Sequence, residues 1–287
     1  MTLFIQHDFF EPWLEYRHAA VRQLAFAVAS PNLLTQHPDA LILKHAFDFH
    51  HHALWQQHYA EYRPRLQQLD QDPTALLQFL QQLKSTRLGL RFEMLLWFWL
   101  RDDAYHPYQL LGHSIQKIEG SRTLGELDFL LLNTATQEVE HWEVALKYYL
   151  GEHDLSLAHW YGLNRSDTLQ RKLTHFTQKQ FQFRHALEHE IQQRFAVFKG
   201  QLYLPQSLHE LNDPLPDWIN PLRRLGQWGH NILDHQAVHR LTRHEWICPN
   251  QHASSTVPQW WTDGLYLNQD TEYYMFRAAP LLSRQPR

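Results

Sequence analysis

Charged side chains interrupt two apolar segments near the middle of the chain. Asp128 lies within residues 125–131, and Glu143 and Lys147 lie within residues 141–147. An isolated charge is costly to bury, so charges in apolar segments are usually paired or bound to a metal. Carboxylate oxygens are typical ligands of hard divalent cations. We therefore expect Asp128 and Glu143 to form a cation site beside the positive charge of Lys147.

The two segments are expected to be neighbouring β-strands that bring these charges together. The polar residues 133–136 between them predict a turn, and the whole pattern indicates a β-hairpin. Successive side chains of a strand point to opposite faces of a sheet, which places Glu143, Ala145 and Lys147 on one face. An ideal strand separates the Cα atoms of residues 143 and 147 by about 13 Å, a gap that a lysine side chain can reduce by reaching back.

The first segment begins Gly125-Glu126-Leu127-Asp128, and an apolar run and a strand that carries Glu and Lys follow it. This pattern resembles the PD-(D/E)XK nuclease superfamily. The resemblance implies an α/β (α+β) fold with a restriction-endonuclease-like core, in which helices flank a mixed central sheet. It also implies metal-dependent hydrolysis of phosphodiester bonds in nucleic acid, DNA in the first instance, with Mg²⁺ or Mn²⁺ as the cofactor.

The resemblance also assigns roles to individual residues. Glu93, on a helix predicted over residues 88–100, takes the place of the superfamily's helical glutamate. The implied catalytic residues are then Glu93, Asp128, Glu143 and Lys147. The implied metal ligands are Asp128, Glu143 and the backbone carbonyl of Val144.

The chain departs from the superfamily at the lysine. The superfamily strand reads Glu-x-Lys, and residue 145 of this chain is alanine. In one interpretation the lysine has moved along the same face to Lys147. In another, Ala145-x-Lys147 occupies the motif position and the acid has moved to Glu143. In a third, the protein is catalytically inactive and binds nucleic acid or a protein partner.

A long helix predicted over residues 166–190 carries further candidates. Lys172 and Lys179 are seven residues apart and share one stripe of such a helix, which Gln178 and Gln180 flank. These side chains are candidates for contacts with nucleic-acid phosphates, which would weaken as salt rises. The alternative is an ordinary solvated helix face.

The chain also resembles, across most of its length, a bacterial family of unknown function. The residues that carry this second resemblance are Leu24-Ala25-Phe26-Ala27 with Ser30-Pro31, the central motif, and Trp160-Tyr161-Gly162-Leu163-Asn164. This resemblance implies no activity.

Composition restricts the class of protein. The net charge of −4 over 287 residues does not indicate a nucleic-acid binder, so a nuclease would need a local basic surface. Cys248 is the only cysteine, which excludes an internal disulfide and a thiolate zinc cluster. No apolar run approaches the roughly 18 residues of a membrane span, and the N-terminus lacks the regions of a signal peptide. We expect a cytoplasmic protein without membrane contact, with nucleic acid and a second copy of itself as partners.

The predicted elements divide the chain into three regions. Residues 1–86 form an N-terminal helical region, residues 87–194 the nuclease-like α/β core, and residues 195–287 a β-containing C-terminal extension that packs on the core. Periodicity predicts helices over 11–29, 54–69, 74–83 and 88–100, and strands over 110–118, 196–204, 239–247 and 272–277. The run His50-His51-His52 cannot share one helix face, so we interpret it as a chance occurrence in a chain with 22 histidines.

Overall fold

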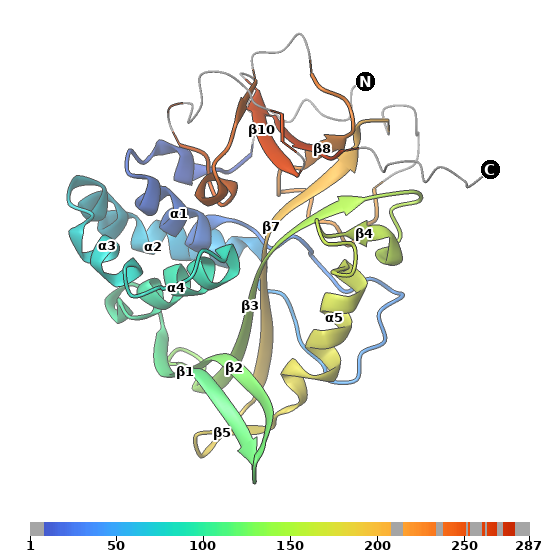
Figure 1. Cartoon of the computed structure of the whole chain (residues 1–287). Helices are drawn as coiled ribbons and strands as arrows, with labels where there is room; N and C mark the ends of the chain where they lie inside the picture. Colours follow the sequence, from blue (N-terminus) through green and yellow to red (C-terminus); the bar gives the residue numbers. More distant parts are fainter. Residues whose placement is uncertain are drawn as a thin grey trace.

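The computed structural model describes residues 9–207, 215–233, 238–250, 252, 260–261, 263–268 and 272–278. Nine strands in this part of the chain form one mixed sheet (Figure 1). The strands are β1 (Tyr108–Glu119), β2 (Arg122–Asn133), β3 (Glu138–Gly151), β4 (Trp160–Tyr161), β7 (Gln193–Pro205), β8 (Gly226–Gly229), β9 (Val238–Arg240), β10 (Gly264–Asn268) and β11 (Tyr273–Phe276). Their order is β1-β2-β3-β7-β8-β11-β10-β9, and β4 pairs with β3 off this path.

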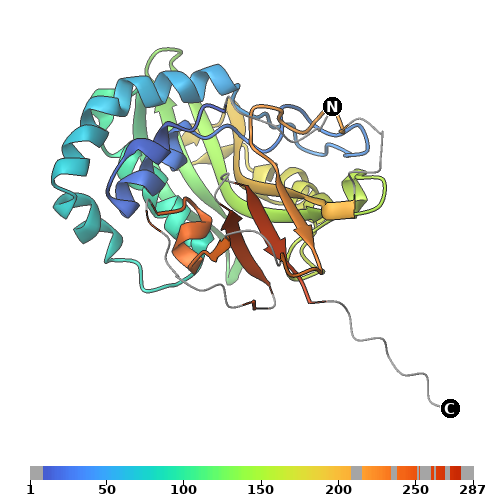
Figure 2. The same ribbon diagram turned by 90° about the horizontal axis from the view of Figure 1, so that it is seen from above.

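Helices flank the sheet on both faces, which confirms the predicted mixed α/β class. They are α1 (Ala19–Ala29), α2 (His52–Gln71), α3 (Thr74–Leu80), α4 (Leu88–Leu100) and α5 (Leu169–Gln178). Figures 1 and 2 show α1 to α4 gathered on one side of the sheet and α5 on the other. No helix among the described residues is long and apolar enough to cross a membrane.

β3 lies in the centre of the sheet and is covered on both faces. It pairs in parallel with β7 from residue 140 to residue 150, and antiparallel with β2, which confirms the predicted hairpin. Its side chains alternate between two apolar clusters. Trp142 and Leu146 pack with α1 to α4, whereas Ala145 and Tyr149 pack with α5. The period of two therefore places Glu143, Ala145 and Lys147 on the α5 face.

The helix predicted over residues 166–190 is wrong beyond Gln178. α5 is followed by a 3-10 turn, η4 (Gln180–Gln182), and by a small hairpin of β5 (His185–Ala186) and β6 (His189–Glu190). The two residues of the hairpin turn, Leu187 and Glu188, have positive φ angles of 47° and 68°. Phe181 nevertheless continues the apolar pattern of α5, because it packs into the same cluster from η4. Burial of that ring, rather than helix continuation, explains the periodicity.

The strand predicted over residues 239–247 is wrong in its second half. β9 ends at Arg240, and residues 243–246 form a 3-10 turn. Thr242 and Glu245 make a capping box, in which each side chain bonds to the backbone of the other. The sequence pattern Thr-x-x-Glu is the signal for this helix start. The prediction followed the alternation of residues 239–247, which is typical of a strand, and did not use that signal.

Lys199 is a fully buried lysine on β7. Its Nζ donates to the backbone oxygen of Ala27 at 2.6 Å and lies 3.4 Å from the centre of the Trp55 ring. Burial lowers the pKa of this amine well below its ordinary value. The unfolded chain therefore binds more protons than the folded protein in the range between the two pKa values, where stability rises with pH.

Replacing Lys199 with methionine is expected to raise the free energy of unfolding at neutral pH by about 1–3 kcal/mol, because an apolar chain of similar length carries no buried charge. Urea unfolding at about pH 7 and about pH 9 measures the effect. Relative to the variant, the wild type should gain stability between these pH values, because only the wild type carries the buried amine. An equal gain in both proteins would contradict the assignment of this pH dependence to Lys199.

Candidate active site

β2 separates from β3 at Asp128. The pairing of these strands ends with Phe129 opposite Trp142, while β2 continues beside β1. Asp128 Oδ2 accepts a hydrogen bond from the Val144 N–H at 2.8 Å, where a strand carbonyl would otherwise accept it. The N–H and C=O groups of one strand residue point to the same side, so the Val144 carbonyl also faces this gap. A carboxylate and a backbone carbonyl thus lie together where the ladder opens.

Glu143 lies beside this gap and is fully buried. His141 Nε2 lies 2.7 Å from its Oε1, and the Gln180 side-chain amide donates to its Oε2. Gln180 in turn accepts a hydrogen bond from Lys172 Nζ at 2.9 Å. The series Lys172, Gln180, Glu143 therefore connects α5 and η4 to β3.

Burial perturbs the pKa values of both carboxyl groups. It raises the pKa of Asp128 well above its ordinary value, and the charge of Glu143 raises it further. It also raises the pKa of Glu143 to about 8, against the opposing effect of Lys172. Both carboxyls are thus held in surroundings that disfavour their charged forms. A bound divalent cation would reverse this effect, because it would be the largest local charge.

Lys172 carries the positive charge that lowers the pKa values of both Asp128 and Glu143. Part of its side chain is exposed, but its amine is enclosed, and burial lowers the pKa of that amine to about 8. The charges of Glu143 and Asp128 both oppose this lowering, so the charges of the three groups act on one another. The amine also lies 3.9 Å from the centre of the Phe176 ring, which holds the side chain against α5.

The residues of the gap fit a hard cation with an incomplete protein shell. Among the described residues, no group of three or more His, Cys, Asp or Glu side chains is placed to hold a metal ion. Asp128, Glu143 and the Val144 carbonyl would supply only part of a coordination sphere. Mg²⁺ is commonly held in this way, by one or two carboxylates with water and substrate phosphate in the other positions.

Glu93 reaches the neighbourhood of the pair from α4. Its charge raises the pKa values of both Asp128 and Glu143. Its own carboxylate is engaged by β1, because Oε1 lies 2.8 Å from His113 Nε2 and 3.4 Å from Ser114 Oγ. The structure thus brings Glu93 to the site as a nearby charge with a histidine partner.

Lys147 has a different partner from the expected one. Its Nζ lies 2.6 Å from Asp167 Oδ2, and Tyr149 donates to the other oxygen of that carboxylate at 3.2 Å. It shares the α5 face with Glu143, as the strand period predicts. The lysine whose charge lowers the pKa values of Asp128 and Glu143 is Lys172, which belongs to another element.

The four candidates for phosphate contact are placed in two groups. Lys172 and Gln180 belong to the hydrogen-bonded series that ends at Glu143. Gln178 and Lys179 are exposed at the end of α5. Because the helix ends at Gln178, the single stripe predicted for these side chains does not form.

His141 and His113 are site residues that the sequence analysis missed. His141 is buried with Glu143, and burial lowers its pKa to about 3, so it is neutral at physiological pH. Its position two residues before Glu143 on the same strand face was a usable signal. His113 carried no comparable signal, because its contact with Glu93 joins β1 to α4.

The chain belongs to the family described as Domain of unknown function (DUF1853), which matches residues 22–274. That range includes β2, β3 and α5, and therefore the whole candidate site. No curated protein and no solved structure matches the chain. The family description carries no activity, and the resemblance to the PD-(D/E)XK superfamily stays a prediction.

Proposed function

We propose that this protein is a metal-dependent phosphodiesterase that hydrolyses nucleic acid, DNA in the first instance. Asp128, Glu143 and the Val144 carbonyl would hold Mg²⁺ or Mn²⁺ in the gap between β2 and β3. The observation that supports this most is that a fully buried carboxyl, Glu143, and a half-buried one, Asp128, both of raised pKa, lie beside Gln180 and its partner Lys172. Such perturbed groups concentrate at functional sites.

The proposed chemistry divides between the cation and the chain. The cation would polarise the phosphate and lower the pKa of a bound water. Lys172 would donate a hydrogen bond to the attacking water or to the phosphate, and would offset negative charge that develops in the transition state. Gln180 would position both Lys172 and Glu143, because it bonds to each of them.

The alanine at position 145 is consistent with this assignment. Ala145 packs in the cluster that includes Leu169, Leu173 and Phe176 of α5, so there is little room for a longer side chain. The amine of Lys172, on α5, is linked to Glu143 through Gln180 instead. Under this proposal Lys172 takes the place of the strand lysine, and the lysine is neither lost nor moved to Lys147.

The alternative is a catalytically inactive protein of the same architecture that binds nucleic acid or a protein partner. Two observations favour it. Glu93 is engaged by His113, and the described residues hold no cluster of three metal-binding side chains. Metal-independent binding of nucleic acid without any product would support this alternative.

Calorimetric titration with Mg²⁺ and with Mn²⁺ tests the metal site. The wild type should bind, and Asp128→Asn should lose at least about tenfold in affinity, because a neutral amide replaces a charged ligand. Asp154→Asn is the matched control, since Asp154 is an acid exposed in a loop and paired with His159. Each protein is also incubated with labelled single- and double-stranded DNA and each metal. No metal-dependent product from the wild type on any substrate would contradict the proposed function.

A further inference from the structure

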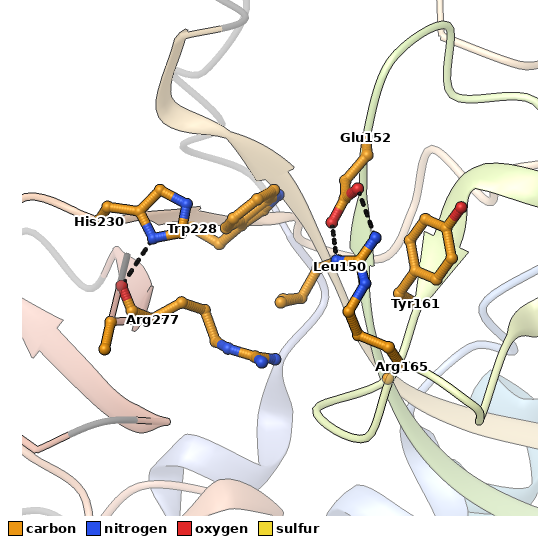
Figure 3. A pocket seen from close by; sticks show the side chains of 9 residues that line it. Leu150, Glu152, Tyr161, Arg165, Trp228, His230 and Arg277 are labelled. Carbon is orange, nitrogen blue, oxygen red and sulfur yellow. Dashed lines mark hydrogen bonds and ion pairs between the residues drawn. The ribbon is translucent and has the colours of Figure 1, made fainter. Parts of the chain in front are cut away.

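A cavity of about 500 Å³ lies at the C-terminal end of β3, away from the carboxylate pair. Leu150, near the end of β3, lines it, and seven residues separate Leu150 from Glu143, a distance of about 23 Å along a strand. Figure 3 shows Trp228, His230 and Arg277 on one side of the cavity and Glu152, Tyr161 and Arg165 on the other. Its volume is within the usual range of small-molecule sites.

The aromatic walls of this cavity are held by contacts of the protein itself. Trp228 Nε1 donates to the Gly151 carbonyl at 2.8 Å, which orients the indole ring. On the other wall, the Arg165 guanidinium lies 4.2 Å from the centre of the Tyr161 ring, and two hydrogen bonds to Glu152 hold it there. Side chains that are already ordered lose little entropy when a ligand binds.

The charges of the cavity are balanced, which favours one ligand chemistry. Arg165 is paired with Glu152, and Arg277 Nε lies 2.6 Å from Asp263 Oδ1. A phosphate would therefore meet guanidinium groups whose charge a carboxylate already offsets. A flat heterocycle should bind this cavity more tightly than a phosphate, because it can stack on an aromatic face and exchange hydrogen bonds at its edge. Carboxylate acceptors and guanidinium donors are the groups that read the edges of nucleobases.

A smaller hollow is lined by residues that follow Arg165 along the chain. This hollow, of about 280 Å³, is lined by Asp167, Arg171 and Lys172 among others. The segment 165–167 borders both spaces, with Arg165 in the large cavity and Asp167 in the hollow. Lys172 then belongs to the hollow and to the candidate active site. Arg165 of the cavity and Lys172 of the candidate active site thus belong to one segment, residues 165–172, which includes the start of α5.

We propose that the cavity binds one unpaired nucleobase of the substrate strand, a few nucleotides from the phosphodiester that is cleaved. The inference rests on the proposed function and adds a substrate class to it, a nucleic acid with a single-stranded segment. A base within a duplex is stacked and paired, and it cannot enter such a cavity without being extruded. Tyr161 and Gly162 belong to the segment 160–164, which carries part of the resemblance to the family of unknown function. Under this proposal they have a role in substrate binding.

The test compares two labelled twelve-residue probes by fluorescence anisotropy in EDTA, so that no cleavage occurs. One is oligothymidylate, and the other is the same phosphodiester chain without bases. The wild type should prefer the probe with bases by about tenfold, the usual size of one stacking contact. Trp228→Leu should lose most of this preference. Trp228→Phe should keep this preference, because phenylalanine retains an aromatic face. Since both variants lack the indole N–H, a difference between them reports on stacking alone.

The outcomes separate this inference from the proposed function. If Trp228→Leu, with an unchanged melting temperature, keeps the wild-type preference, the cavity is not a base site. If the wild type shows no preference but cleaves DNA with Mg²⁺, the inference is overturned and the proposed function stands. If the wild type binds neither probe, the inference is also overturned, and metal-dependent cleavage alone decides the proposed function.

Discussion

Replacing Glu143 with glutamine is expected to reduce cleavage by on the order of a thousandfold, because the neutral amide can neither hold the cation nor balance its charge. The substitution keeps the size of the side chain and its bonds to His141 and Gln180. Its effect on cleavage should therefore not come from unfolding. Single-turnover cleavage with saturating metal measures the loss. A variant with more than a tenth of the wild-type rate would remove Glu143 from the proposed machinery.

The same substitution should make the folded protein more stable at about pH 8. Burial raises the pKa of Glu143 from 4.5 to about 8, so the folded protein binds this proton more tightly than the unfolded chain. The stability contributed by the protonated carboxyl is present below about pH 4.5 and is lost as the pH rises to about 8. Glu143→Gln avoids that loss, and it should exceed the wild type by about 1–3 kcal/mol at pH 8 and by little at pH 5.

Urea unfolding at both pH values checks this difference in the absence of metal. Glu152→Gln is the control of opposite sign, because its partner Arg165 lowers the pKa of Glu152. That variant should be less stable than the wild type by nearly the same amount at pH 5 and at pH 8, because the stability linked to a lowered carboxyl pKa is already present above about pH 4.5. If Glu143→Gln were also less stable than the wild type at pH 8, the buried carboxyl would not be a source of instability. An activity loss joined to a stability gain is the usual signature of a functional site.

Replacing Lys172 with methionine is the second substitution with a large expected effect. It should lower the cleavage rate by roughly a hundredfold or more, because it removes the charged donor that we assign to the proposed site. Lys147→Met is the matched control from the same face of the sheet. Its amine is paired with Asp167 in a partly exposed ion pair, so its loss should cost less than about tenfold in rate and little stability.

The two lysine variants also distinguish between the interpretations of position 145. If the lysine of the site has moved along β3, Lys147→Met should be the inactive protein and Lys172→Met should retain activity. If neither variant changes a measurable rate, no lysine takes part in the step that limits it. Thermal unfolding of both variants confirms that each is folded before the rates are compared.

Much of the candidate site was predictable from local sequence. The alternation of apolar residues and the polar turn at 133–136 predicted that β2 and β3 are neighbours, and the structure confirms it. Because strand side chains alternate between faces, the same pattern placed Glu143 and Lys147 on one face. The helix α4, which carries Glu93, was predicted over residues 88–100 and is found there, since its apolar residues recur at helical spacing.

Other features depended on contacts between distant segments. Periodicity did not reveal that α5 ends at Gln178 and that η4 turns Gln180 toward Glu143, because Phe181 is buried in the same cluster from outside the helix. The cavity beside Trp228 was equally hidden, since its walls come from the end of β3, from β4 and β8, and from the segment after β11.

The choice of lysine shows where local information ends. Strand alternation states which face a side chain takes, and it placed Lys147 beside Glu143 in projection. It does not state which helix covers that face or which of its side chains reaches the carboxylates. Packing of α5 on Ala145 decided this, because it places Lys172 where it bonds to Gln180, the partner of Glu143, while Asp167 engages Lys147. The carboxylates were thus readable in the sequence, and their cationic partner was set by tertiary packing.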